Sequence, residues 1–236
     1  MAIFNIYKPA GLTPLLALEK LRGQKPELAD IKMTYAGRLD PLAEGVMLVV
    51  TGEDIGRKDE FLNLAKTYEV EVLFGVATDT GDVLGLVTEF GSAELNIEEI
   101  KTATAGLVGR RVQTAPPYSA PGLDDKVFSK EIEIFSIEVG ELTRISAPDL
   151  LFDVEKRVGE VTGDFRQAKI TACWQKYLAN SSQTFSVVKL TISASSGTYI
   201  RVLAEDLGRV LGVPALAYKI KRTRVGAYQI SEAASL

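Results

Sequence analysis

The sequence predicts an α+β protein in which a mixed, largely antiparallel central sheet is flanked by helices. Segments with the alternation of a strand and segments with the periodicity of a helix follow one another along the 236 residues. They lack the regular strand–helix–strand spacing of a parallel sheet. The apolar fraction of 46% and the charged fraction of 25% are those of an ordinary soluble globular protein. A chain of this length can bury a sizeable core, in one large domain or two small ones.

Local signals place the individual elements. Thr13 is a plausible N-cap with Pro14 at the first helical position, and Asn96 with Glu99 resembles a capping box. Residues 22–34 are polar and are expected to form a loop. Together the patterns predict strands at residues 3–7, 46–50, 68–74, 185–194 and 225–230, and helices at residues 14–21, 55–65, 97–107 and 198–211.

Residues 130–139 contain a break in strand periodicity. Ile132 and Ile134 would share one face of a strand, whereas Phe135, Ile137 and Val139 would share the other. A strand cannot change the face that it buries without an inserted residue. We therefore expect a β-bulge or bend near Ile134.

Residues 146–183 carry the least informative pattern in the chain. The segment contains Trp174 and Tyr177. Either side chain could belong to the core or lie under an additional hairpin, and the pattern does not distinguish the two arrangements.

The composition excludes several classes of function. Cys173 is the single cysteine and there is no histidine, which excludes a disulfide framework, a cysteine or histidine metal site and a histidine-based catalytic triad. The N-terminus has no basic signal-peptide region, and no apolar stretch reaches membrane-spanning length. We expect a protein of the reducing cytoplasm that does not bind a membrane.

The charge is distributed unevenly. The net charge is −4 and the pI is about 5.2, which is unusual for a protein that binds RNA. Residues 201–224 nevertheless contain six basic and two acidic residues. This cluster is either a solvated helix face or a surface that follows RNA phosphates.

A loop at residues 37–45 places one carboxylate, Asp40, at the start of the predicted buried strand. Pro41 fixes its own backbone and disfavours helical geometry at Asp40. A carboxylate held in such a turn can cap the turn, act as a general acid or base, or act as a covalent nucleophile.

The sequence of this loop resembles the catalytic loop of pseudouridine synthases. The surrounding sequence resembles the TruB family, which modifies a uridine of the tRNA T-loop. The resemblance covers roughly residues 3–120 and 185–230. It rests on further matches in the expected order: YKPAGLT (7–13), KTYEV (66–70), Gly75 with TDTGD (78–82) and Gly85, Gln113 with PPYSA (116–120), SGTYIR (196–201), and LAEDLG (203–208) with Leu211 and Gly212.

The resemblance implies a pseudouridine synthase fold and an isomerase that converts a uridine, uridine 55 of tRNA, to pseudouridine. The N1–C1′ bond breaks, the base rotates and it is rejoined through C5. This reaction needs no cofactor or metal, but one ionised carboxylate must take part, and the resemblance assigns that role to Asp40. Whether it adds to the substrate or assists departure of the base and removes the C5 proton is left open.

The resemblance also assigns residues around the carboxylate. A carboxylate in a closed site needs a cation opposite it to stay charged, and Arg201 takes that position. Tyr68 matches the tyrosine that stacks on the flipped uracil, while Tyr199 and Ile220 match pocket walls. Lys8 matches a basic position near the active site, where a structural salt bridge is an equal alternative.

Other acidic residues near these motifs are expected to have no part in the chemistry. Asp79 and Asp82 are expected to order their own loop. Glu44, four residues after Asp40, invites a comparison with paired-carboxylate glycosidases but is expected to be solvated.

Three departures from the family pattern concern the RNA. Tyr35 stands where the TruB pattern has a histidine, five positions before the aspartate, and we expect it to contact the substrate. The RNA-gripping insertion after Tyr118-Ser119-Ala120 is replaced by a short link to the strand at Lys130. We also expect no C-terminal PUA-type domain, because the chain ends near Leu236.

We therefore expect residues 1–236 to form a single catalytic domain with a divergent insertion at about 146–183. The expected partner is RNA, tRNA first, bound by a monomer. The alternatives are an RNA-binding or RNA-folding protein on the same scaffold, a synthase that acts on a different RNA, and a glycosidase that acts on free nucleosides. The basic residues expected to contact the RNA backbone are Lys219, Lys221, Arg222 and Arg224.

Overall fold

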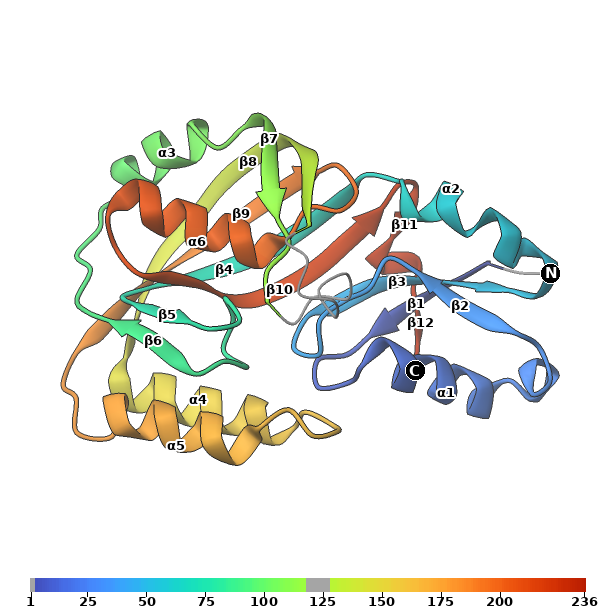
Figure 1. Ribbon diagram of the computed structural model, residues 1–236, viewed down its shortest axis with the longest axis horizontal. Coiled ribbons are helices and arrows are strands. Elements are labelled where there is room, and N and C mark those ends of the chain that lie inside the picture. Colours follow the sequence, from blue (N-terminus) through green and yellow to red (C-terminus); the bar gives the residue numbers. More distant parts are fainter. Residues whose placement is uncertain (1–2, 118–127) are drawn as a thin grey trace.

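The structure, a computed structural model, describes residues 3–117 and 128–236, and its largest feature is a ten-stranded sheet (Figure 1). The main path has the order β12-β1-β3-β10-β4-β9-β8-β7, with β11 on β10 and β2 on β3. Among the described strands of this sheet, only β1–β12 and β10–β3 pair in parallel, which confirms the predicted mixed, largely antiparallel sheet. The strands are β1 (Ile3–Lys8), β2 (Met33–Ala36), β3 (Glu44–Thr51), β4 (Lys66–Phe74), β7 (Gly109–Thr114), β8 (Ser129–Ser146), β9 (Thr184–Ala194), β10 (Ala215–Val225), β11 (Tyr228–Gln229) and β12 (Ala234–Ser235).

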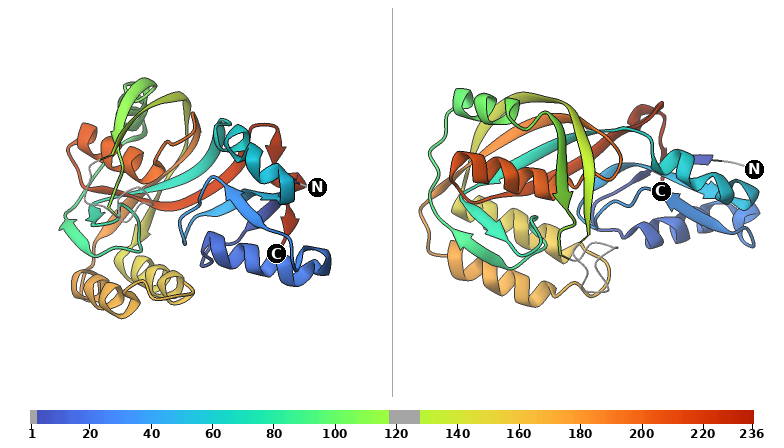
Figure 2. Two further views of the ribbon diagram at one scale, coloured as in Figure 1. Left: turned by 45° about the vertical axis from the view of Figure 1, so that its right-hand side comes forward. Right: turned by 45° about the horizontal axis from the view of Figure 1, so that its top comes forward.

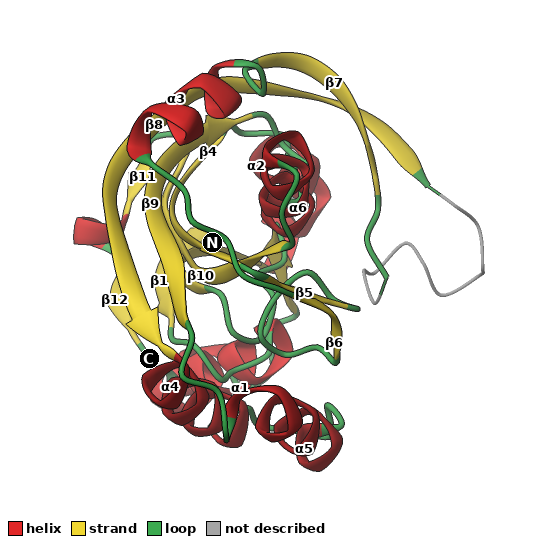
Figure 3. Cartoon of the chain, turned by 90° about the vertical axis from the view of Figure 1, so that its left-hand side faces the viewer, coloured by secondary structure: helices red, strands yellow, loops and turns green. Residues whose placement is uncertain are grey.

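Helices and a second small sheet, β5 (Val76–Thr78) with β6 (Val87–Phe90), surround this sheet. In Figure 3 the large sheet curves around α6. No helix in the described residues is long and apolar enough to cross a membrane. The α-helices are α1 (Pro14–Gln24), α2 (Lys58–Leu62), α3 (Ile97–Ala105), α4 (Ala147–Gly159), α5 (Gln167–Leu178) and α6 (Ile200–Leu211), and short 3-10 helices lie at Pro26–Leu28, Gly52–Arg57 and Ile230–Glu232.

The central strands bury both faces, because successive side chains of a strand point to opposite sides. Val70 and Val72 of β4 belong to the core that includes Leu207 of α6. Leu73, between Val72 and Phe74 in the chain, belongs instead to the core that includes Trp174 of α5. Helix α6 and the α4–α5 pair therefore pack on opposite faces of the sheet (Figure 2).

The predicted caps and the predicted bulge are confirmed. The Thr13 hydroxyl accepts a hydrogen bond from the Leu16 amide, and Asn96 with Glu99 forms the full capping box of α3. The pairing of β8 with β9 shifts register between Ile134 and Ser136. The inserted residue brings Ile137 and Val139 onto the same core as Ile132 and Ile134, although the sequence alternation changes at this point.

Two segments were assigned wrongly. Strand β2 lies within the predicted polar loop and its continuation, and β10 lies where the sequence suggested a basic surface before a last strand at residues 225–230. Strand β10 pairs with both β3 and β4, so it is central in the sheet. The charged residues of β10 prevented its prediction as a strand, because a central strand ordinarily has an apolar sequence.

Residues 146–183 contain the helical hairpin α4–α5, with Trp174 in the core that the hairpin covers and Tyr177 packed against that core. Trp174 is fully buried and its indole nitrogen donates a hydrogen bond to the Gly85 carbonyl oxygen, 3.1 Å away. Tyr177 is half-buried, with its ring centroid 5.2 Å from that of Phe90. The Tyr118-Ser119-Ala120 match lies outside the described residues.

Candidate active site

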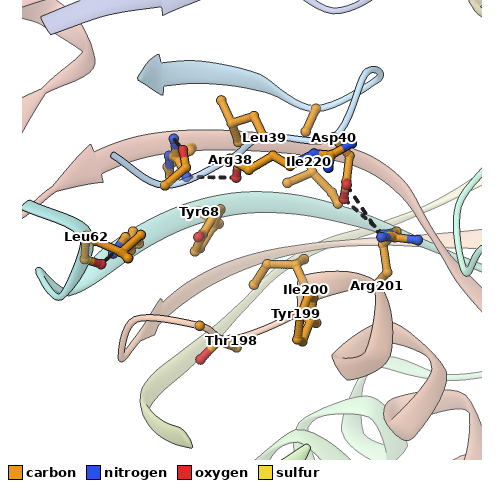
Figure 4. Close-up of a pocket in the computed structure, with 15 residues that line it drawn as sticks. Arg38, Leu39, Asp40, Leu62, Tyr68, Thr198, Tyr199, Ile200, Arg201 and Ile220 are labelled. Atoms are coloured by element: carbon orange, nitrogen blue, oxygen red, sulfur yellow. Dashed lines mark hydrogen bonds and ion pairs between the residues drawn. The ribbon is translucent and has the colours of Figure 1, made fainter. Parts of the chain in front are cut away.

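Asp40 lies in the turn between β2 and β3, where two loop features fix its place. Gly37 has a φ of +92°, a conformation that L side chains rarely adopt, and the Ala43 amide donates a hydrogen bond to the Asp40 carbonyl oxygen. The Asp40 side chain remains 31% exposed and lines a pocket (Figure 4). A carboxylate held this way is fixed in position and still accessible from the pocket.

Arg201, at the start of α6, pairs with Asp40 as predicted. Its Nε lies 2.9 Å from Asp40 Oδ2 and its Nη2 lies 3.4 Å from Asp40 Oδ1, which is the forked geometry of an arginine–carboxylate pair. A third donor, Nη1, bonds the Thr80 carbonyl oxygen. Burial opposes the charge on Arg201, but Asp40 and Asp82 outweigh it and raise the pKa of the guanidinium. Arg201 is therefore a fixed cation.

Asp82 lies behind this pair, with Oδ2 4.0 Å from Arg201 Nε. It accepts hydrogen bonds from the Thr80 hydroxyl and the Leu84 amide, so it orders its own loop as expected. Burial raises the pKa of Asp82, and the charge on Arg201 opposes that shift.

Side chains from several separate parts of the chain join the Asp40 loop in forming the pocket. Tyr68 comes from β4, Ile220 from β10, and Tyr199 immediately precedes α6. Gln113 of β7 holds the Tyr199 backbone at both its amide and its carbonyl group. The structure thus brings together five residues expected at the site: Asp40, Tyr68, Tyr199, Arg201 and Ile220.

Arg222 and Lys66 also line the pocket, although neither was expected there. Arg222 is buried, with Nε 2.8 Å from the Val46 carbonyl oxygen and Nη2 3.0 Å from that of Gly37. It therefore fixes the backbone of the Asp40 loop. Lys66 donates hydrogen bonds to the Leu62 and Leu64 carbonyl oxygens, and burial lowers its pKa to about 8. The one available signal for Lys66 was its place two residues before Tyr68 in the KTYEV match.

The expectation that Lys219, Lys221, Arg222 and Arg224 form one phosphate-contacting surface is wrong. Arg222 is buried, whereas Lys219 and Lys221 line a different depression together with Glu71, and Lys219 Nζ is 3.1 Å from the Glu71 carboxylate. Arg224 is exposed and bonds the Gly226 carbonyl oxygen. Alternation along β10 separates residues that are consecutive in sequence.

Lys8 and Tyr35 do not line the pocket. Lys8 is fully buried behind the Asp40 turn, and its Nζ donates to the carbonyl oxygens of Pro9, Leu12 and Pro41. Burial lowers the pKa of Lys8 to about 7, although the nearby charges of Asp40 and Glu44 oppose that shift. Tyr35 pairs with Val49 in the sheet and packs against the core, so its expected substrate contact is not supported.

Glu44 is not a second carboxylate of this pocket. Its Oε2 accepts a hydrogen bond from the Tyr7 hydroxyl at 2.7 Å, and it lines the depression that contains Lys219 and Lys221. It is half-buried rather than solvated. Asp40 is the only carboxylate among the described lining residues of the pocket.

Solved structures share this fold. The chain aligns with one from "Crystal Structure of a Cbf5-Nop10-Gar1 Complex" at a TM-score of 0.65 and 20% identity, covering 99% of this chain and 52% of the other. It aligns with one from "Structure of H/ACA RNP bound to a substrate RNA containing 2'-deoxyuridine" at 0.63 and 18%, covering 99% and 50%. The molecule thus shares the fold of these chains and carries a carboxylate–arginine pair in its central pocket.

The sequence comparisons define the family. The family described as TruB family pseudouridylate synthase (N terminal domain) matches residues 25–160. Proteins named tRNA pseudouridine synthase B are 31% identical over 97% of this chain in Aromatoleum aromaticum and 31% over 96% in Endomicrobium trichonymphae. The chain belongs to the TruB family, as its motifs predicted. It spans 64% of the Aromatoleum protein, 85% of the Endomicrobium protein and about half of the solved chains.

Proposed function

We propose that this protein is an RNA pseudouridine synthase that isomerises uridine 55 in the T-loop of tRNA, with Asp40 as its catalytic carboxylate. The observation that carries the proposal is the Asp40–Arg201 pair, which exposes one anion in a pocket walled by Tyr68 and Ile220. The names of its relatives support tRNA as the substrate.

Each group around the pocket has a task in this reaction. The flipped uracil lies against Tyr68, which is buried and fixed in β4, and Ile220 closes the pocket on β10. Arg201 holds Asp40 as the anion, the form that acts as a nucleophile or a base. Burial raises the pKa of Tyr68, with Arg222 opposing the shift, so the phenol stays protonated and is not the general base.

We further propose that the protein acts on RNA as a monomer in the cytoplasm, without a metal or cofactor. The single cysteine supports a reducing compartment. An isomerisation has no net redox change and no hydrolysis, so the proposal assigns no co-reactant.

The test is release of tritium from tRNA transcripts labelled at C5 of uridine, followed by mapping of the modified position. We expect tritium release that stops near one equivalent per tRNA and a modification at position 55. A transcript with cytidine at that position is the control and should release none above background. Release from the control at the same rate would contradict the position, and absence of release from every RNA would contradict the activity.

A further inference from the structure

A second pocket lies on the other side of the Asp40–Arg201 pair. It has a volume of about 270 Å³, close to the lower end of small-molecule sites at roughly 300 Å³. Asp40, Arg201 and Arg38 line both this pocket and the first one. The two pockets are therefore neighbours that share a charged boundary.

The outer wall of the second pocket is the link between α4 and α5, residues 160–166, here called the connector. Phe165 of the connector is half-buried and lines the pocket together with the apolar side chains of Pro41 and Leu84. The connector belongs to the segment that carries none of the matched TruB motifs. This wall thus comes from a part of the chain to which the family resemblance assigns no role.

Contacts with both loops beside Asp40 fix the connector in place. The Thr162 amide donates to the Gly11 carbonyl oxygen, and the Gly11 amide donates to that of Pro41, each at 2.9 Å. Arg166 pairs with Asp79 at 2.9 Å, in the loop whose Thr80 carbonyl group holds Arg201. Figure 1 shows the connector at the end of the hairpin that points toward the turn between β1 and α1.

The chemistry of the second pocket suits a nucleobase. An aromatic ring and two apolar side chains offer flat contact surface, and stacking on such a ring accepts any base. Arg38 at the shared boundary is exposed and makes no ion pair with any described residue. An uncompensated cation between two base-sized pockets suits the phosphate that links two consecutive nucleotides.

We propose that the second pocket binds the base of the nucleotide next to the target uridine, with Phe165 as its stacking surface and Arg38 on the intervening phosphate. This inference rests on the proposed function for the occupant of the first pocket. It makes the α4–α5 hairpin an RNA-contacting element of this protein. Phe165 would be a specificity residue rather than a catalytic one.

The test combines protein variants with modified RNA. A T-loop stem–loop is prepared intact, with an abasic site 5′ of the target uridine, and with an abasic site 3′ of it. The proteins are wild type, Phe165→Ala, Phe165→Leu, and Phe152→Ala as the matched control, because Phe152 lies on α4 outside the pocket and is 71% exposed. Dissociation constants come from fluorescence anisotropy, and tritium release is measured on the same RNAs.

Wild type should bind one of the two abasic RNAs about 5- to 150-fold more weakly than intact RNA, the range of one base–aromatic stack. Phe165→Ala should show a similar loss on intact RNA and no further loss on that abasic RNA. Phe152→Ala should behave as wild type. Phe165→Leu keeps apolar packing without the aromatic face, so it should show the same pattern and covers the case in which the alanine variant does not fold.

Equal affinity of the Phe165 variants and wild type for intact RNA would overturn the inference. The inference would also be overturned if the loss of affinity from the Phe165 variant and the loss from the abasic RNA multiplied when the two were combined. Multiplied losses would mean that Phe165 and the missing base act independently rather than through one shared contact. If the Phe165 and abasic losses of affinity proved coupled but wild type released no tritium, the proposed activity would be contradicted and the assignment of the second pocket would stand. If wild type released tritium but the two losses of affinity were not coupled, the proposed activity would stand and the assignment of the second pocket would be contradicted.

Discussion

At the scale of single residues, the site depends on buried cations held by backbone carbonyl groups. Arg201, 161 positions away from Asp40 in the chain, bonds both the carboxylate and the Thr80 carbonyl group. Arg222 and Lys8 support the same turn from the Gly37 and Pro41 sides. These bonds offset part of the cost of burying three charges, and they fix the place of Asp40 before any RNA binds.

The lowered pKa of Lys8 leads us to predict how stability depends on pH. Its pKa falls from 10.5 to about 7 in the folded state, so the unfolded chain binds more protons between these values. The free energy of unfolding should therefore rise with pH across this window, by at most about 1.4 kcal/mol per pH unit from this group. Urea unfolding of wild type and Lys8→Met at pH 6.5 to 9.5 measures the difference. Since Lys66 contributes equally to both proteins, the slope for Lys8→Met should be smaller, and identical slopes would refute the assignment.

At the scale of elements, distant segments are held together by close backbone approach. Gly11 has a φ of +88°, and a Cβ there would lie 2.7 Å from the Glu160 carbonyl oxygen. Trp174 of α5 donates a hydrogen bond to Gly85 in a different loop, the one between β5 and β6. The hairpin is thus part of the frame of the site.

We expect Gly11→Ala to lower the free energy of unfolding by about 1–3 kcal/mol, because an L side chain is strained at this φ and clashes with the connector. Gly159→Ala is the matched control at the end of α4, where nothing lies within 4 Å of the added Cβ and the φ is ordinary. Thermal or urea unfolding compares the two. Equal stability of both variants would show that the connector does not approach Gly11 this closely.

Structural features could be predicted from the sequence where they depend on neighbouring residues in the chain. The bulge near Ile134 followed from a change of buried face, and the caps at Thr13 and Asn96 followed from residue type. The place of β10 did not follow, because it depends on pairing with β3 and β4 far away in the chain. Arg222 was missed for the same reason, since the carbonyl groups that surround it come from residues 37–46.

At the scale of the whole molecule, the cations of β10 and of the pocket offer little to follow an RNA backbone. Of the four basic residues of β10, Arg222 is buried, Lys219 and Lys221 line another depression, and Arg224 is exposed outside the pocket. Arg38 is the exposed cation that lines the pocket. The acidic net charge of −4 gives no general attraction to RNA. The recognition we infer depends on loop shape and base contacts.

A minimal T-loop stem–loop should therefore serve nearly as well as whole tRNA. Each phosphate neutralised contributes roughly 0.7–0.9 to the salt slope, so two cations give a slope below about 2. Steady-state kinetics on both RNAs, with binding measured from low to high salt, tests both statements. A preference for whole tRNA above about a hundredfold, or a slope well above 2, would show phosphate contacts elsewhere on the protein.

The most direct measurement is tritium release by Asp40→Asn, compared with RNA binding by the same protein. The amide keeps the shape of the side chain but is neither a nucleophile nor a base, so release should fall at least about a thousandfold while binding changes little. Glu44→Gln is the matched control, since Glu44 follows Asp40 by four residues and faces away from the pocket. It should retain near wild-type release. Release by Asp40→Asn above about one part in a thousand of wild type would contradict a catalytic role for Asp40.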